Sequence, residues 1–307
     1  MEHPTHTELA DRWQCCRDLL ARFLPESRGL LVFSRLNIYY LSGSFANGIF
    51  WLPREGRPVL LCRRGLERAR LESPVAAIHP FRSYADIPDL LAQAGSPLGT
   101  TVAAEMNGLS WALAGSLTRH LHDVRFLAGD RVPAMARAVK SAQELAILRQ
   151  AGAKHARCMR ELLPPLLAPG MTEREIAHAL IRVFLDQGHQ GLMRMESYGE
   201  EVFLGHVAAG ENANYPSVFN GPVGLLGEHP AIPHLGSAGK VWQAGEPLVI
   251  DCGFMLEGYH TDRTQVYWPG ERGEVPERAQ AAHHFCLELQ AEVAERLRPG
   301  VLPCDIW

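Results

Sequence analysis

The sequence predicts an α/β (α+β) protein with two domains, over residues 1–134 and 135–307. Three observations carry this prediction. Short apolar runs alternate with helical stretches over the first 134 residues. Two carboxylates border strand-like runs between residues 247 and 268. A long helical stretch followed by Leu-x-Pro-Gly occurs twice in the second domain, at 167–170 and 297–300, which indicates an internal repeat.

The first domain is predicted to be an α/β unit. Apolar residues at helical spacing between 9 and 23 predict a helix that ends at Pro25. Apolar β-branched and aromatic runs predict strands at 29–33, 38–41, 49–52, 58–62, 75–78, 101–104 and 124–127. Helical stretches are predicted around 64–72, 84–94 and 109–121.

The second domain follows a junction predicted near residues 131–133. An apolar stripe from Leu145 to Leu166 predicts a long helix. Thr172 and Glu175 form a capping box, in which the Thr side chain accepts from the helix amides and the Glu side chain reaches back. Another long helix is predicted at 276–297, at the start of the second copy of the repeat.

Composition excludes several classes of function. Thirty Lys and Arg against thirty-four Asp and Glu give a net charge of -4, which argues against a nucleic-acid partner. No apolar run is long enough for a membrane span, and the polar start predicts no signal peptide. Seven dispersed cysteines without a CxxC pair indicate reduced thiols, so we expect a cytoplasmic protein.

The strongest candidate site is a pair of aspartates. Asp251 ends an apolar run at 247–250, and Asp262 precedes a strand-like run at 264–268. An antiparallel hairpin would bring the two carboxylates side by side, where they repel each other. A divalent cation, or a pair of them, is the usual reason for such an arrangement. The sequence therefore predicts a metal-binding hairpin.

The hairpin pattern Asp-x-Gly-x4-Gly-Tyr-x2-Asp-x-Thr, at 251–264, resembles that of the M24 pita-bread metallopeptidases. This family includes methionine aminopeptidase, aminopeptidase P, prolidase and creatinase, and the Xaa-Pro branch is the most similar. Three other segments resemble family motifs: Asn-Ile-Tyr-Tyr-Leu-Ser-Gly at 37–43, Lys-Ser-Ala-Gln-Glu at 140–144 and Pro-Gly-Met-Thr-Glu-Arg-Glu-Ile at 169–176. The resemblance implies a creatinase-like N-terminal domain followed by a pita-bread catalytic domain.

The resemblance also implies an activity, which is metal-dependent cleavage of peptides next to proline. Asp251 would bind one of two divalent ions and Asp262 would bridge both, with Mn²⁺ or Co²⁺ expected and Zn²⁺ or Fe²⁺ as alternatives. His234 lies seventeen residues before Asp251, at the family's place for a substrate-facing histidine. His206 and His229 are rival candidates. A Gly/Pro-rich insertion at 217–231 departs from the family pattern.

Three further ligands of the family, a His and two Glu, would follow the hairpin, and residues 263–307 contain no such segments. We therefore expect a pita-bread domain that is incomplete at its C-terminal end, with weak or no metal binding and no peptidase activity of its own. The expected partners are a peptide with proline at its second position and a second copy of the chain. Two alternatives are a non-catalytic binding module and a metal-free creatinase-like amidinohydrolase, although the aspartate pair argues against the latter.

Overall fold

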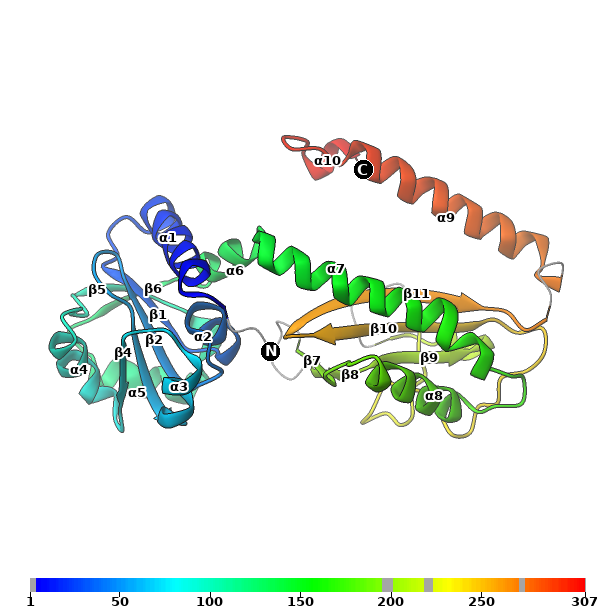
Figure 1. The fold of residues 1–307 in the computed structure, drawn as a ribbon, viewed down its shortest axis with the longest axis horizontal. Helices are drawn as coiled ribbons and strands as arrows, with labels where there is room; N and C mark the ends of the chain where they lie inside the picture. Colours follow the sequence, from blue (N-terminus) through cyan, green and yellow to red (C-terminus); the bar gives the residue numbers. More distant parts are fainter. Residues whose placement is uncertain (1–3, 195–200, 218–222, 271–273, 307) are drawn as a thin grey trace. The chain divides into compact units, whose positions relative to one another are not determined.

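The computed structural model describes residues 4–194, 201–217, 223–270 and 274–306 (Figure 1). The chain divides into two compact units, Met1–Ser141 and Ala142–Trp307, which are described separately. None of the helices in the described ranges combines the length and the apolar character that crossing a bilayer requires.

The first unit is built on a mixed six-stranded sheet with the order β4-β3-β2-β1-β5-β6. Neighbouring strands among β1, β2 and β3 are antiparallel, whereas β3–β4, β1–β5 and β5–β6 are parallel. The strands are β1 (Gly29–Val32), β2 (Asn47–Pro53), β3 (Val59–Arg64), β4 (Ala77–Pro80), β5 (Thr101–Ala104) and β6 (Arg125–Ala128). The central strands are apolar almost throughout because both faces of the sheet are covered.

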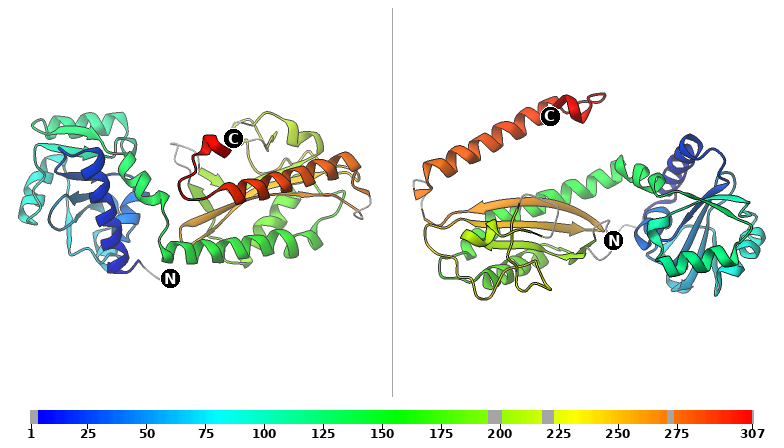
Figure 2. Two further views of the ribbon diagram at one scale, coloured as in Figure 1. Left: turned by 90° about the horizontal axis from the view of Figure 1, so that it is seen from above. Right: turned by 180° about the vertical axis from the view of Figure 1, so that it is seen from behind.

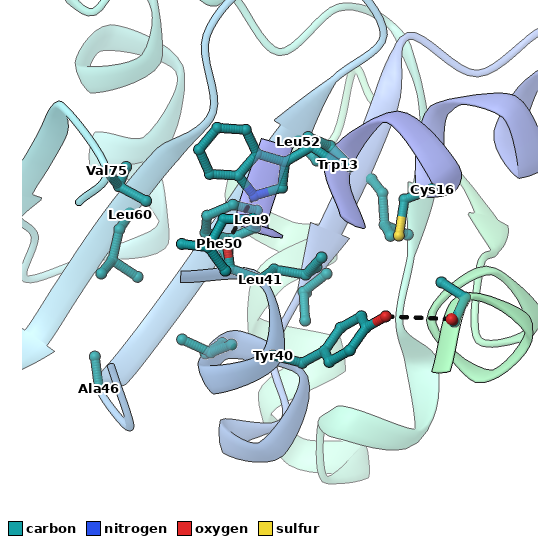
Figure 3. Packing of buried hydrophobic residues seen from close by; sticks show 14 of the residues in the cluster. Leu9, Trp13, Cys16, Tyr40, Leu41, Ala46, Phe50, Leu52, Leu60 and Val75 are labelled. Atoms are coloured by element: carbon teal, nitrogen blue, oxygen red, sulfur yellow. Dashed lines mark hydrogen bonds between the residues drawn. The ribbon is translucent and has the colours of Figure 1, made fainter. Parts of the chain in front are cut away.

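Two separate cores pack on the two faces of this sheet. One contains Leu30 and Phe50 and is closed by helices α1 and α2, where Trp13 and Leu41 are buried (Figure 3). The other contains Trp51 and includes residues of α4 and α5. The helices of the unit are α1 (His6–Phe23), α2 (Arg35–Ser42), α3 (Leu66–Glu72), α4 (Ile87–Gln93), α5 (Trp111–His120) and α6 (Arg131–Ala138).

The strand predicted at 38–41 is wrong, because this segment lies in helix α2. The Ser34 side chain caps the helix start, and Gly43 ends the helix in the left-handed conformation. The buried Glu105 carboxylate accepts from the Ser34 amide at 2.8 Å and from the Asn37 side chain at 2.5 Å. These caps and the packing against α1 outweigh the strand preference of an Ile-Tyr-Tyr run.

The second unit contains a three-stranded antiparallel sheet with the order β11-β10-β9 and a small two-stranded sheet of β7 and β8. The strands are β7 (Leu192–Arg194), β8 (Glu201–Phe203), β9 (Gly205–Ala209), β10 (Leu248–Leu256) and β11 (Tyr259–Tyr267). Helix α7 (Ala142–Arg157) packs along β10 and β11, and α8 (Glu173–Asp186) packs along β9 (Figure 1). Figure 2 shows these elements from two further sides.

The predicted hairpin is confirmed. Strands β10 and β11 are joined by Glu257 and Gly258, whose φ angles of 51° and 83° are both positive. Two positive φ angles define the tight turn that matches the twist of antiparallel strands. The turn fixes the register, which pairs Asp251 with Thr264 and Gly253 with Asp262.

The predicted capping box of α8 is present, since Thr172 accepts from the Glu175 amide and the Glu175 carboxylate accepts from the Thr172 amide at 2.7 Å. The predicted last helix is α9 (Glu277–Arg296), and it is followed by the short α10 (Pro303–Ile306). No described residue of α9 is buried, and Phe285 is 65% exposed. Part of the 217–231 insertion lies outside the described residues.

Candidate active site

The β9–β10–β11 sheet has two unlike faces, because side chains alternate along each strand. Ile250, Cys252 and Phe254 of β10 point to the face covered by α7 and α8, where they join the core of the unit. Asp251 points to the opposite face. His206 of β9 and Thr264 of β11 pair with Asp251 across the sheet, and Asp262 of β11 pairs with Gly253. These paired residues share the face of Asp251.

Asp251 and Asp262 are diagonal neighbours on this open face. Partial desolvation raises the pKa of the Asp262 carboxyl, and the nearby Asp251 carboxylate raises it further. The two carboxylates therefore repel each other. A hydrogen bond from the Arg263 backbone and the nearby His260 oppose this rise. The Thr264 hydroxyl donates to Asp251 Oδ1 at 2.6 Å and so orients that carboxylate. The register thus places the two predicted ligand residues on one surface.

His206 belongs to the same group of side chains. It is 8% exposed, and it lies directly across from Asp251 in the β9–β10 pair. Burial lowers the pKa of its imidazole, the Asp251 carboxylate raises it, and the His234 imidazole lowers it. Both Asp251 and His234 are therefore electrostatic neighbours of His206.

His234 reaches this group from a loop outside the sheet. The next residue, Leu235, forms a bridge with His206, in which the Leu235 amide donates to the Gly205 carbonyl at 2.9 Å and the Val207 amide donates to the Leu235 carbonyl at 3.2 Å. Leu235 has a φ of 61°, a conformation that costs a non-glycine residue about 1–3 kcal/mol. Burial lowers the pKa of His234, so its imidazole is neutral at pH 7.

Close backbone approach underlies this arrangement at Gly205. A Cβ atom added there would lie 2.2 Å from the Asp251 carbonyl oxygen and 2.6 Å from Cys252 Cα. Gly205 also has a φ of 134°, which side chains rarely tolerate. Only glycine therefore allows β9 to start against the Asp251 segment and to bring His206 opposite Asp251.

A buried imidazole lies behind the aspartates, on the covered face of the sheet. His155 of α7 is 1% exposed and contacts Cys252 Sγ at 3.5 Å and Thr261 Oγ1 at 3.0 Å. Its two partners are the chain neighbours of Asp251 and Asp262, one on each strand. Burial first, and then Arg263 and His189, lower the pKa of His155 to about 4, so it is neutral at pH 7.

The fit to a metal ion is partial. Asp251 and Asp262 repel each other, and a bound cation would relieve this repulsion. Their oxygen atoms suit a divalent ion that prefers oxygen ligands. Within the ranges that the structure describes, however, no three His, Cys, Asp or Glu side chains gather closely enough to hold an ion. Asp251 and Asp262 thus fit as part of a ligand set.

Sequence comparison decides the family. A model of metallopeptidase family M24 matches residues 146–307, and a model of the creatinase/prolidase N-terminal domain matches residues 25–139. The chain belongs to metallopeptidase family M24. It is by family a hydrolase that cleaves peptides, and M24 proteins generally bind divalent metals. The second unit is accordingly an M24 pita-bread domain and the first a creatinase-like N-terminal domain, as the motifs predicted.

Several M24 relatives resemble most of the chain. The probable dipeptidase PepE of Mycobacterium tuberculosis is 30% identical over 291 residues, which cover 89% of this chain and 67% of the relative. The solved prolidase from Pyrococcus horikoshii OT3 superposes with a TM-score of 0.73 at 19% identity, covering 96% of this chain and 75% of that one. The X-Pro aminopeptidase from Thermotoga maritima MSB8 superposes with a TM-score of 0.69 at 22% identity, covering 90% of this chain and 71% of that one. At these identities, the structural likenesses show the fold.

The structure changes the ranking of the candidate histidines. The sequence favoured His234 over His206 and His229. In the structure His206 lies directly across from Asp251, and His234 is an electrostatic neighbour of His206. His229 lies in a local turn with Ile232. Local patterns did not identify His206, because the register between its strand and the Asp251 strand is set only in the folded sheet.

Proposed function

We propose that the chain provides the aspartate half of the active site of a metal-dependent peptidase that cleaves Xaa-Pro bonds. The observation that supports this most is the shared open face, on which Asp251, Asp262 and His206 are brought together by strand register. The family implies peptide substrates, and the relatives include a prolidase and an X-Pro aminopeptidase. The preference for proline, the two-ion site and its occupation by Mn²⁺ or Co²⁺ are parts of the proposal.

Each residue has a proposed role. Asp251 and Asp262 would hold the metal, which when bound supplies a Lewis acid that polarises a peptide carbonyl and activates water. Two carboxylates alone give a weak site, since affinity grows with the number of ligands. The neutral His234 would donate a hydrogen bond to the peptide where negative charge develops. His206, neutral and opposite Asp251, would help to fix the orientation of that carboxylate.

Metal binding by the Asp262→Asn variant tests the proposal most directly. Loss of one carboxylate should weaken Mn²⁺ binding by at least about 10–100-fold, measured by electron paramagnetic resonance. Glu257→Gln is the matched control, because it removes one charge from the same hairpin at the turn and should leave binding unchanged. Equal Mn²⁺ affinity in wild type and Asp262→Asn would contradict the assignment.

Peptide cleavage is the second test. Any Mn²⁺-stimulated hydrolysis of an Ala-Pro dipeptide should disappear in Asp262→Asn and should exceed hydrolysis of Ala-Ala. His234→Ala should lower turnover far more than Mn²⁺ binding, because its proposed partner is the substrate. Turnover that survives in Asp262→Asn would show that the cleavage belongs to another site.

Two finer expectations accompany this function. The dispersed cysteines, of which Cys16, Cys62, Cys158 and Cys252 are buried as free thiols, support a reducing compartment such as the cytoplasm. We also propose a homodimer, which sedimentation equilibrium would test. The exposed apolar side chains of α9, such as Phe285 and Leu289, support association of some kind.

A further inference from the structure

Glu173, the first residue of α8, is a carboxylate that solvent does not reach, with 0% exposure. It accepts hydrogen bonds from three uncharged donors on three segments. The Ala209 amide donates to Oε1 at 2.7 Å, the Asn212 side chain donates to Oε1 at 3.0 Å, and the Ser237 amide donates to Oε2 at 2.9 Å. Burial raises the pKa of Glu173, and these three bonds counteract the rise.

The three donors come from the segments that build the open face. Ala209 ends strand β9, which carries His206, and Asn212 lies in the 3₁₀ turn that follows. Ser237 lies three residues after His234. The carboxylate therefore joins the end of β9 to the loop that presents His234.

The His234 loop also closes onto the start of α8 through its backbone. The Glu173 amide donates to the Lys240 carbonyl at 3.0 Å, and the Arg174 amide donates to the Ser237 carbonyl at 3.3 Å. A Cβ atom added to Gly236 would lie 2.6 Å from Glu173 Cβ. On its other side, His234 is held by the bridge between Leu235 and His206.

The cap of α8 does not explain Glu173. The capping box already uses Thr172, the residue before Glu173, and Glu175, two residues after it. The Glu173 side chain instead turns away from the helix amides toward the three donors. Its contacts lie on the segments around the open face, and one of its donors, Ser237, follows two residues after Leu235, whose backbone is left-handed.

We propose that Glu173 is a positioning residue that holds the His234 loop against strand β9 and so fixes His234 beside His206. The inference rests on the proposed role of His234 only for its effect on catalysis. It also gives a physical reason for the Glu of the Pro-Gly-Met-Thr-Glu motif at 169–173, because this carboxylate accepts a hydrogen bond from the Asn212 side chain.

The test is hydrogen exchange of the Glu173→Gln variant, followed by mass spectrometry. A glutamine has the same shape as Glu173 but only one acceptor oxygen. Its side-chain NH₂ group must therefore face at least one of the three N–H donors, and that hydrogen bond is lost. Exchange at 234–240 should rise about tenfold, while α7 keeps its wild-type protection. Glu175→Gln is the matched control, because it removes a charge from the same helix turn while a glutamine can still complete the capping box, so exchange at 234–240 should stay unchanged.

Gly236→Ala provides a second route that keeps the Glu173 charge. Its added Cβ would push the loop off α8 and should reproduce the faster exchange at 234–240, even if Glu173→Gln does not fold. Wild-type exchange at 234–240 in a folded Glu173→Gln protein, or in Gly236→Ala, would overturn the proposal. An even loss of protection across the second unit in both variants would also overturn it, because it would indicate a purely structural role.

Mn²⁺ binding and turnover separate this proposal from the proposed function. Glu173→Gln should leave Mn²⁺ affinity within about twofold of wild type, because Asp251 and Asp262 keep their strand register. Where the protein cleaves Xaa-Pro peptides, kcat should fall and KM should stay within the same factor. Faster exchange at 234–240 with unchanged kcat would support positioning by Glu173 and contradict catalysis by His234.

Discussion

The two faces of the β9–β10–β11 sheet differ in what they contribute. The covered face packs Phe254 against Phe184 with ring centroids 5.3 Å apart, and it encloses His155. The open face carries Asp251 and Asp262, which repel each other and stabilise nothing by themselves. Neighbouring residues of β10 therefore differ in role, since Cys252 packs in the core and Asp251 lies on the open face. Stability is expected to depend on the covered face and metal binding on the open face.

The largest effect on stability is expected from Phe254→Ala on the covered face. Phe254 is fully buried, so its loss should cost the second unit about 3–5 kcal/mol of unfolding free energy. Urea unfolding followed by hydrogen exchange within β10 measures this. Phe285→Ala on the exposed α9 is the control and should stay within about 0.5 kcal/mol. Similar costs for both variants would break the comparison.

His155 predicts how the covered face responds to acid. Its folded pKa of about 4 lies below its ordinary value of 6.5, so the unfolded chain binds the proton first as pH falls. Stability should be full above about pH 6.5 and should drop by about 3 kcal/mol as pH falls to about 4. His155→Leu should show a shallower loss between pH 7.5 and 4.5 in urea unfolding. An unchanged pH dependence would show that another group is responsible.

The smallest effect is expected from Thr264→Val on the open face. This change removes the hydrogen bond to Asp251 but retains a side chain of similar shape that suits a strand. The unfolding free energy should change by no more than about 1 kcal/mol, measured by the same urea titration. Mn²⁺ binding should weaken at the same time, because Asp251 is less well oriented. A stability loss comparable to that of Phe254→Ala would mean that the open face also contributes to the core.

Most of the second unit could be predicted from local patterns. The alternation in β10 separates Asp251 from Cys252, and the Glu-Gly turn sets the register that pairs Gly253 with Asp262. The capping box at Thr172 marks the start of α8. These features depend on residues close together in the sequence, so they are readable from the chain. The strand expected at 38–41 failed because the carboxylate of Glu105, about seventy residues away, supports the start of a helix there.

The sequence by itself determined the family motifs and the choice of Asp251 and Asp262 as candidate ligands, because each rests on local spacing. Only the tertiary structure decided that His206 lies opposite Asp251 and that Glu173 joins the His234 loop to β9. The physical reason is sequence separation. Glu173 and Ser237 are 64 residues apart, and a hydrogen bond over that distance exists only after the sheet and helix have packed.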